Sequence, residues 1–136
     1  MSTPPISFDP PSGEYRPGAC NIGPAEIARR RRSGLVGLGA AAVLATARVI
    51  LDAPAMTRWL VALPLAGGAV GLLQARFRFC AAFGLAGVSN FRALGEAERV
   101  RDATARRADR AKAVAILLAG GAVGLVGALL FVLLPL

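Results

Sequence analysis

Residues 113–136 read AVAILLAGGAVGLVGALLFVLLPL, a run of 24 residues without a charged side chain. About 20 apolar residues in a helix cross the roughly 30 Å hydrocarbon core of a bilayer. Two shorter apolar runs precede this one, Gly34–Leu51 and Trp59–Ala75. The second run contains Pro64, which a membrane helix tolerates. The sequence therefore predicts an all-α integral membrane protein with three transmembrane helices.

The last apolar run shares a short repeat with the second run. Residues 66–73 read AGGAVGLL and residues 119–126 read AGGAVGLV, so seven of eight positions are identical. Each copy has the GxxxG spacing, which places two glycines on one helix face and allows two backbones to approach closely. The alternative is a coincidence, because Ala, Gly, Val and Leu dominate the membrane runs. The glycines predicted to pack helices, within the chain or against a partner, are Gly67, Gly71, Gly120 and Gly124.

The charged residues lie mainly at the ends of the apolar runs. The chain is 55% hydrophobic and 18% charged, with 16 basic and 8 acidic residues and a net charge of +8. An average soluble domain has about 25% charged residues. Basic residues that stop where apolar runs begin are typical of membrane flanks rather than of a nucleic-acid surface. The arginines predicted to contact anionic lipid headgroups are Arg29, Arg30, Arg31, Arg32, Arg76 and Arg78.

The distribution of basic residues also predicts an orientation in the membrane. Residues 76–112 contain nine basic residues, whereas the turn between the first two runs has Arg58, with Arg48 at its edge. The positive-inside rule then places the N-terminus and the 76–112 loop in the cytoplasm and the C-terminus outside. We expect a prokaryotic inner (cytoplasmic) membrane as the location.

The sequence divides into four segments. Residues 1–23 are rich in proline and are predicted to form an N-terminal tail. Residues 24–90 are predicted to form a transmembrane hairpin that ends in Phe79–Val88, an apolar piece too short to cross the membrane and therefore interfacial or re-entrant. Residues 91–112 are rich in charge and are predicted to form a solvated cytoplasmic helix. Residues 113–136 then form the third transmembrane helix.

The reactive side chains are few. The chain has two cysteines, Cys20 and Cys80, and no histidine, the usual ligand of zinc and haem and the usual base for a cysteine nucleophile. We therefore predict no catalytic residue, no metal site and no cofactor. A hairpin puts both cysteines on the same side of the membrane. One interpretation is a thiol pair with a pKa lowered by Arg30 and Arg78; the other, which we favour, is structural burial.

Two short motifs flank the predicted hairpin. The first is Asn21-Ile22-Gly23 followed by Glu26, Arg30 and Gly34, and the second is Phe79-Cys80-Ala81-Ala82-Phe83 followed by Gly87-Val88-Ser89. Over about residues 20–90, these motifs and their spacing resemble the YgaP-like transmembrane domain family. The chain departs from that pattern at Ile27, Ala81 and Phe83, where the family commonly has Arg, Pro and Tyr. The resemblance implies a small inner-membrane hairpin, and it does not transfer the sulfurtransferase activity of some family members.

These features favour a function without catalysis. We expect a small accessory subunit of a larger membrane complex, for example a respiratory or photosynthetic one. Its partners would be larger integral membrane subunits and anionic phospholipid, without nucleic acid. One alternative is a free-standing membrane protein with a thiol, sulfur or redox-sensing role through Cys20 and Cys80. Another is a homo-oligomeric pore built on the glycine faces.

Overall fold

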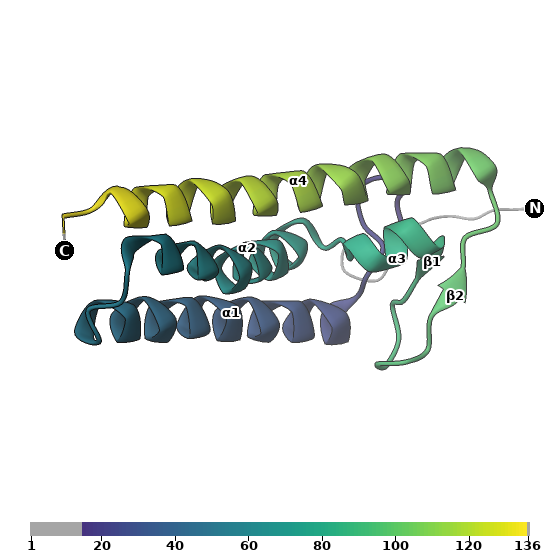
Figure 1. Cartoon of the computed structure of the whole chain (residues 1–136). Coiled ribbons are helices and arrows are strands. Elements are labelled where there is room, and N and C mark those ends of the chain that lie inside the picture. Colours follow the sequence, from purple (N-terminus) through teal and green to yellow (C-terminus); the bar gives the residue numbers. More distant parts are fainter. Residues whose placement is uncertain (1–14, 136) are drawn as a thin grey trace, which may run out of the picture. The chain divides into compact units, whose positions relative to one another are not determined.

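The computed structural model describes residues 15–135, which are mostly helical (Figure 1). Three of its helices are long and apolar enough to cross a membrane: Pro24–Ile50, Ala55–Phe77 and Ala103–Leu133. This agrees with the predicted class of all-α membrane protein with three spans. In chain order the elements are α1 (Pro24–Ile50), the 3₁₀ helix η1 (Ala55–Val61), α2 (Ala62–Phe77), α3 (Ala81–Ala86), β1 (Val88–Ser89), β2 (Glu98–Arg99) and α4 (Ala103–Leu133).

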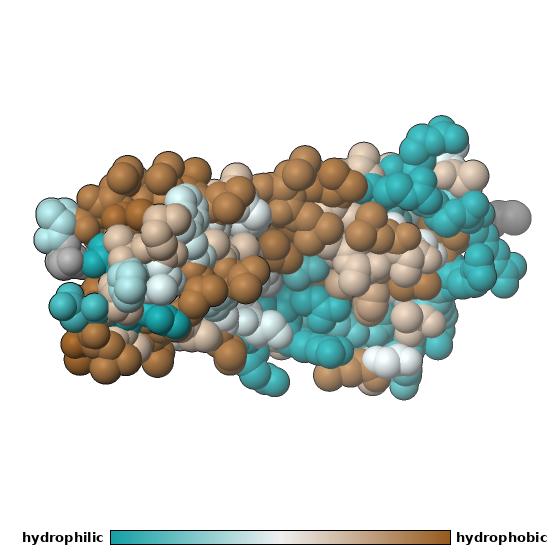
Figure 2. All heavy atoms as spheres, in the orientation of Figure 1, coloured by the Kyte–Doolittle hydropathy of each residue, from teal (hydrophilic) through white to brown (hydrophobic). Residues whose placement is uncertain are grey.

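The chain contains two compact units. Among the described residues, the polar unit comprises residues 15–29 and Gln74–Val114. The helix unit comprises Arg30–Leu73 and residues 115–135. Helices α1, α2 and α4 contribute residues to both units. Apolar side chains cover much of the visible surface of the helices in the helix unit, whereas hydrophilic side chains gather over β2 and the start of α4 in the polar unit (Figure 2).

In the helix unit, α1 and α2 approach each other through glycine. A Cβ atom placed on Gly71 would lie 2.7 Å from the Cα of Gly34. One placed on Gly37 would lie 2.7 Å from the Cα of Gly68. Real side chains do not make contacts this short, so the two backbones meet only because all four positions lack a side chain.

Helix α4 packs against α2 through the second copy of the repeat. A Cβ atom on Gly124 would lie 2.6 Å from the Cβ of Ala66, and one on Gly120 would overlap the side chain of Val70. Both glycines of this copy therefore lie at a close approach between helices. In the helix unit α2 lies between α1 and α4, so it uses two of its faces for packing (Figure 1).

The first copy of the repeat packs differently from the prediction. Gly71 lies at the contact with α1, but a Cβ atom on Gly67 would meet nothing within 4 Å among the described residues. Within the chain, Gly68 therefore makes the contact with α1 that was expected of Gly67, and packing of Gly67 against a partner stays a prediction. Residues three apart share a helix face as well as residues four apart do, and the position of α1 selects the 68/71 pair.

Arg58 ties η1 to the C-terminal end of α4. Its Nη1 atom donates hydrogen bonds to the carbonyl oxygens of Phe131 and Leu134, each at 3.0 Å. Its guanidinium also lies 5.0 Å from the centre of the Phe131 ring. The last carbonyl groups of a helix have no partner within the helix and carry partial negative charge, so a buried arginine stabilises them. Arg58 thus stabilises the contact between η1 and α4 within the protein, in addition to its place beside an apolar run.

The segment between β1 and α4 corrects the predicted helix over residues 91–112. Residues 91–102 are not helical, and β1 pairs with β2 in an antiparallel register that joins Val88 to Arg99. Helix α4 begins at Ala103 because the Asp102 carboxylate accepts a hydrogen bond from the Ala105 amide at 2.9 Å, as an N-cap residue does. From there α4 continues without a break into the predicted third span, so one helix replaces the two expected.

The predicted N-terminal tail is in part folded into the polar unit. Residues 15–23 are described, and Cys20, Asn21, Ile22 and Gly23 are buried. Ile22 forms a parallel bridge with Asn90, which lies next to β1 in the chain. The part of the prediction that concerns residues 1–14 lies outside the described residues.

The Phe79–Val88 segment forms much of the core of the polar unit. Phe79, Cys80 and Ala81 are almost fully buried, and α3 ends at Gly87 with a left-handed φ of 77°. A Cβ atom on Gly84 would lie 2.8 Å from the Phe79 ring. The start of the segment is therefore covered by protein, and its interfacial or re-entrant place in a membrane stays a prediction.

The glycine contacts predict opposite effects for two neighbouring substitutions in α2. Gly71→Ala places a methyl group against the Gly34 backbone and is expected to lower the free energy of unfolding by about 1–3 kcal/mol. Gly67→Ala is the matched control, which meets open space and gains helix propensity of up to about 1 kcal/mol. Loss of helicity measured by circular dichroism during SDS titration in mixed micelles compares them. Equal losses of helicity in Gly71→Ala and Gly67→Ala would contradict the packing of Gly71, rather than Gly67, against α1.

Candidate functional site

Asn21 joins three segments of the polar unit. Its side-chain oxygen accepts a hydrogen bond from the Cys80 amide at 2.7 Å, and its side-chain nitrogen donates to the Cys80 carbonyl at 3.2 Å. Its main chain bonds to the Arg78 carbonyl and to the Asn90 amide. Because the main chain and the side chain of this buried residue are both hydrogen-bonded, Asn21 stabilises one arrangement of the three segments. The two motifs noted in the sequence therefore meet at Asn21 and Cys80.

Asn90 forms a second buried hub. Its side-chain nitrogen donates to the Glu26 carboxylate and to the Ala93 carbonyl, both at 2.9 Å. Its side-chain oxygen accepts from the Arg92 amide at 2.9 Å, and its carbonyl accepts from the Gly23 amide. Asn90 thus holds the start of α1 beside the loop that follows β1, and the role visible in these contacts is structural.

Asp109 on α4 holds residues 15–20 in place. The Tyr15 hydroxyl donates to one oxygen of this buried carboxylate at 2.6 Å, and the Gly18 amide donates to the other at 2.7 Å. Gly18 adopts a left-handed φ of 68°, in a turn closed by the bridge between Arg16 and Cys20. This turn carries Arg16 and Cys20 to one wall of a cavity.

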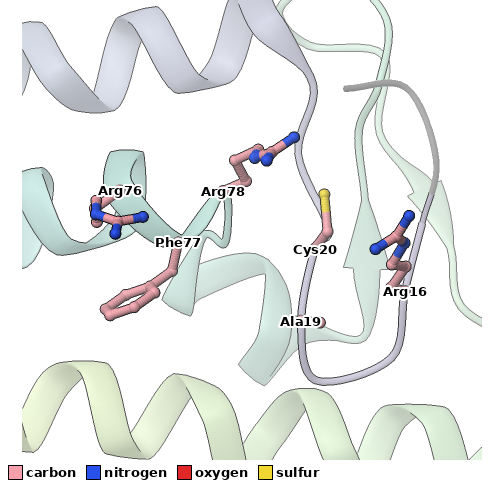
Figure 3. A pocket seen from close by; sticks show the side chains of 6 residues that line it. All are labelled: Arg16, Ala19, Cys20, Arg76, Phe77 and Arg78. Atoms are coloured by element: carbon pink, nitrogen blue, oxygen red, sulfur yellow. The ribbon is translucent and has the colours of Figure 1, made fainter. Parts of the chain in front are cut away.

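That cavity has a volume of about 270 Å³ (Figure 3). The end of α2 supplies the residues of the opposite wall. The sulfur of Cys20 lies between the guanidinium groups of Arg78 and Arg16 in this view. None of the six described residues that line the cavity is acidic, so its surface is basic. They are Arg16, Ala19, Cys20, Arg76, Phe77 and Arg78.

Arg78 has an unusual backbone conformation for its residue type. The Phe79 amide bonds to the Gln74 carbonyl and the Arg78 amide to the Ala75 carbonyl, which together close α2 as a Schellman motif. This motif requires a left-handed residue, and Arg78 has a φ of 54°. Glycine is the usual residue there, because a side chain adds about 1–2 kcal/mol of strain.

The two cysteines lie in the same unit, and both are buried. No disulfide joins them, and the Cys20 thiol donates a weak hydrogen bond to the Ile22 carbonyl at 3.7 Å. Burial raises the pKa of the Cys20 thiol, although Arg78 and Arg16 act in the opposite direction. Of the two interpretations, a lowered thiol pKa is therefore wrong for Cys20, since the loss of hydration outweighs the nearby arginines. Both cysteines are buried, as the favoured interpretation expects.

Two of the arginines predicted to contact lipid line the cavity of the polar unit. Arg76 and Arg78 line the cavity, where they are joined by Arg16, a residue that the sequence reasoning did not select. About 60 positions separate Arg16 from Arg76 in the sequence, and no local pattern joins them. The four arginines at the start of α1 are divided at the boundary of the two units, with Arg29 in the polar unit and residues 30–32 in the helix unit.

These observations define a small, mostly helical protein that has three candidate membrane spans, a compact polar unit and a basic cavity in that unit. Among the described residues, no group of three His, Cys, Asp or Glu side chains could hold a metal ion. No family model, curated protein or solved structure matches the chain. The resemblance to the YgaP-like transmembrane domain family therefore stays a prediction.

Tyr15 offers a direct spectroscopic test of the contact with Asp109, because it is the sole tyrosine of the chain. Burial, with help from the hydrogen bond and charge of Asp109, raises the pKa of Tyr15 above its usual value of 10.0. Titration of tyrosinate absorbance at 295 nm should therefore show ionisation well above pH 10. Asp109→Asn should move the titration toward pH 10, whereas the more distant Asp102→Asn should move it less. Unchanged titration in Asp109→Asn contradicts the contact.

The same shift predicts the pH dependence of stability. The raised pKa means that the folded protein keeps the phenol proton at a pH where the unfolded chain has lost it. The contribution of Tyr15 is therefore fully present below pH 10 and is lost as the pH rises toward the folded pKa. Denaturation midpoints measured between pH 8 and pH 11.5 should fall more steeply above pH 10 in the wild type than in Tyr15→Phe.

Proposed function

We propose that the protein is a non-catalytic membrane subunit that packs its helices against larger integral membrane subunits and contacts anionic phospholipid. The observation that carries this proposal is the exposure of the apolar helices. Only 11%, 28% and 22% of the most apolar windows of the three candidate spans are buried within the chain. Val43 and Val36 on α1 are 71% and 66% exposed. Lipid or neighbouring helices must cover such surfaces in a membrane.

The polar unit supports a role without catalysis. Its buried polar side chains Asn21, Asn90 and Asp109 are engaged in hydrogen bonds that hold chain segments together. Enzymes instead tend to place reactive groups with shifted pKa values in a cleft beside a base or an acid. The cavity contains arginines and one thiol, whose raised pKa makes it a poor nucleophile at neutral pH.

The alternative functions have less support. A redox role through Cys20 and Cys80 would need both thiols to be accessible, and Cys80 is only 1% exposed. A pore would need polar groups along the spans. Gln74 is one such residue of α2, but its side-chain oxygen accepts a hydrogen bond from the Ala81 amide at 2.7 Å within the polar unit.

Photo-crosslinking combined with native purification tests the proposed role as a subunit. A photoreactive amino acid at Val43, on the exposed face of α1, should crosslink stoichiometrically to one defined set of membrane proteins. The control position is Leu94, which is also exposed but lies in the polar loop before β2. Mass spectrometry after purification in a mild detergent identifies the products. Recovery of a monomer alone, with lipid adducts only, would contradict the subunit role and leave the lipid contact.

The orientation can be tested separately with reporter fusions. We propose a prokaryotic inner membrane with residues 76–112 in the cytoplasm and the C-terminus outside, because the nine basic residues of that loop favour the cytoplasmic side. Alkaline phosphatase fused after Leu136 should be active, and green fluorescent protein fused there should be dark. Both reporters inserted at Gly95, in the loop before β2, should give the opposite result. Fluorescence from the C-terminal fusion contradicts the orientation.

A further inference from the structure

We propose that the cavity bounded by Arg16, Arg76 and Arg78 binds a phosphate group, carried either by an anionic phospholipid or by a soluble phosphate compound. The inference deepens the lipid contact within the proposed function, and it does not depend on any partner subunit. The proposal assigns the phosphate to one defined cavity. A general attraction between basic residues and an anionic membrane would not require such a cavity.

The first argument is the convergence of arginines from two distant segments. Arg16 comes from the turn that Asp109 holds in place, and Arg76 and Arg78 come from the end of α2 (Figure 3). The cavity of about 270 Å³ has room for a phosphate group and part of its ester. Guanidinium groups bind phosphate oxygens through paired hydrogen bonds, so Arg16 and Arg78, on either side of Cys20, favour this anion. Arg76 lies farther along the wall, near Phe77, and adds positive charge (Figure 3).

The second argument is the electrostatic effect on Cys20. Arg78 and Arg16 each favour the charged form of this thiol, because their positive charges lie near the sulfur on the cavity wall. Burial nevertheless keeps the thiol in its neutral form, so the sulfur does not compete with an anion for the arginines. The thiol also provides a chemical probe inside the site.

The third argument is the residue type at position 78. The Schellman motif that ends α2 places this residue at a φ of 54°, where glycine would avoid the strain. An arginine at this position costs about 1–2 kcal/mol of backbone strain and delivers a guanidinium group to the cavity wall. Strained residues are concentrated at binding sites because the function needs the side chain.

The surroundings of Phe77 favour a lipid as the source of the phosphate. Phe77 is the last residue of the candidate span Ala55–Phe77, and its ring is partly exposed on the cavity wall. The Lys112 Nζ atom lies 4.4 Å from the ring centre. An aromatic ring with cations at the end of an apolar span is typical of the headgroup region. A phospholipid could therefore place its phosphate in the cavity and its acyl chains beside the span.

The test measures the alkylation rate of Cys20 by iodoacetamide in the purified full-length protein. The almost fully buried Cys80 serves as the internal control for unfolding in the same peptide mass spectra. One arm adds inorganic phosphate to protein in neutral detergent, against chloride at equal ionic strength. The other compares nanodiscs of phosphatidylcholine with nanodiscs that contain phosphatidylglycerol. An occupied cavity should slow the Cys20 reaction at least three-fold, because the ligand blocks access and neutralises the arginines that favour the thiolate.

The variants separate the cavity from general charge. Arg16→Gln and Arg78→Gly should abolish the slowing, and Arg78→Gly should fold at least as well as the wild type because glycine suits its backbone. The control Arg107→Gln removes the same charge from an exposed position of α4 outside the cavity and should keep the slowing.

Each outcome decides the proposal. Slowing by phosphatidylglycerol alone supports the site with a lipid ligand, and slowing in both arms supports it for phosphate compounds in general. Slowing in neither arm overturns it. If Arg107→Gln and Arg78→Gly reduce the slowing of Cys20 alkylation equally, the proposal is also overturned, since the slowing would then depend on net charge. None of these results depends on the crosslinking that tests the subunit role.

Discussion

Two membrane helices can pack without large side chains only where their backbones come close enough for dispersion forces to act over a long line of contact. Gly34 and Gly71 make this approach between α1 and α2, and Gly37 and Gly68 repeat it one turn away. Lipid is as apolar as leucine, so burial of leucine between helices gains little in a membrane, and close packing has to stabilise the pair. The packing of α4 follows the same rule at Gly124.

The polar unit is held together by a different kind of interaction. Its segments are short, and hydrogen bonds from buried amide side chains hold them together. Asn21 bonds to both main-chain groups of Cys80, and Asn90 bonds to Glu26 and to its own loop. A buried amide group without its hydrogen-bond partners would cost about 1–3 kcal/mol of desolvation. Asn21 and Asn90 therefore strongly favour the one arrangement of the segments that satisfies them.

Arg78 connects this architecture to the proposed phosphate site. Its main chain ends α2 and accepts a hydrogen bond from Asn21, while its side chain lines the cavity. A residue that serves both the helix end and the cavity makes the shape of the site depend on the fold of the polar unit. The exposed apolar faces of the helices remain available for lipid or for neighbouring subunits, which is the arrangement expected of a small membrane subunit.

The sequence by itself determined the class of the protein, because hydrophobicity over about 20 residues is a local property that does not depend on tertiary contacts. It also indicated that the repeat at residues 119–126 packs helices. It could not select Gly68 over Gly67, since the rotation of α2 depends on where α1 lies. It could not bring Arg16 to Arg76, nor predict the contacts of residues 15–23, because those contacts join parts of the chain that are distant in sequence. The pairing of Val88 with Arg99 is local, but the helix-forming composition of residues 91–112 concealed it. Only the tertiary structure decided the pKa of Cys20, since burial opposes the local charges there.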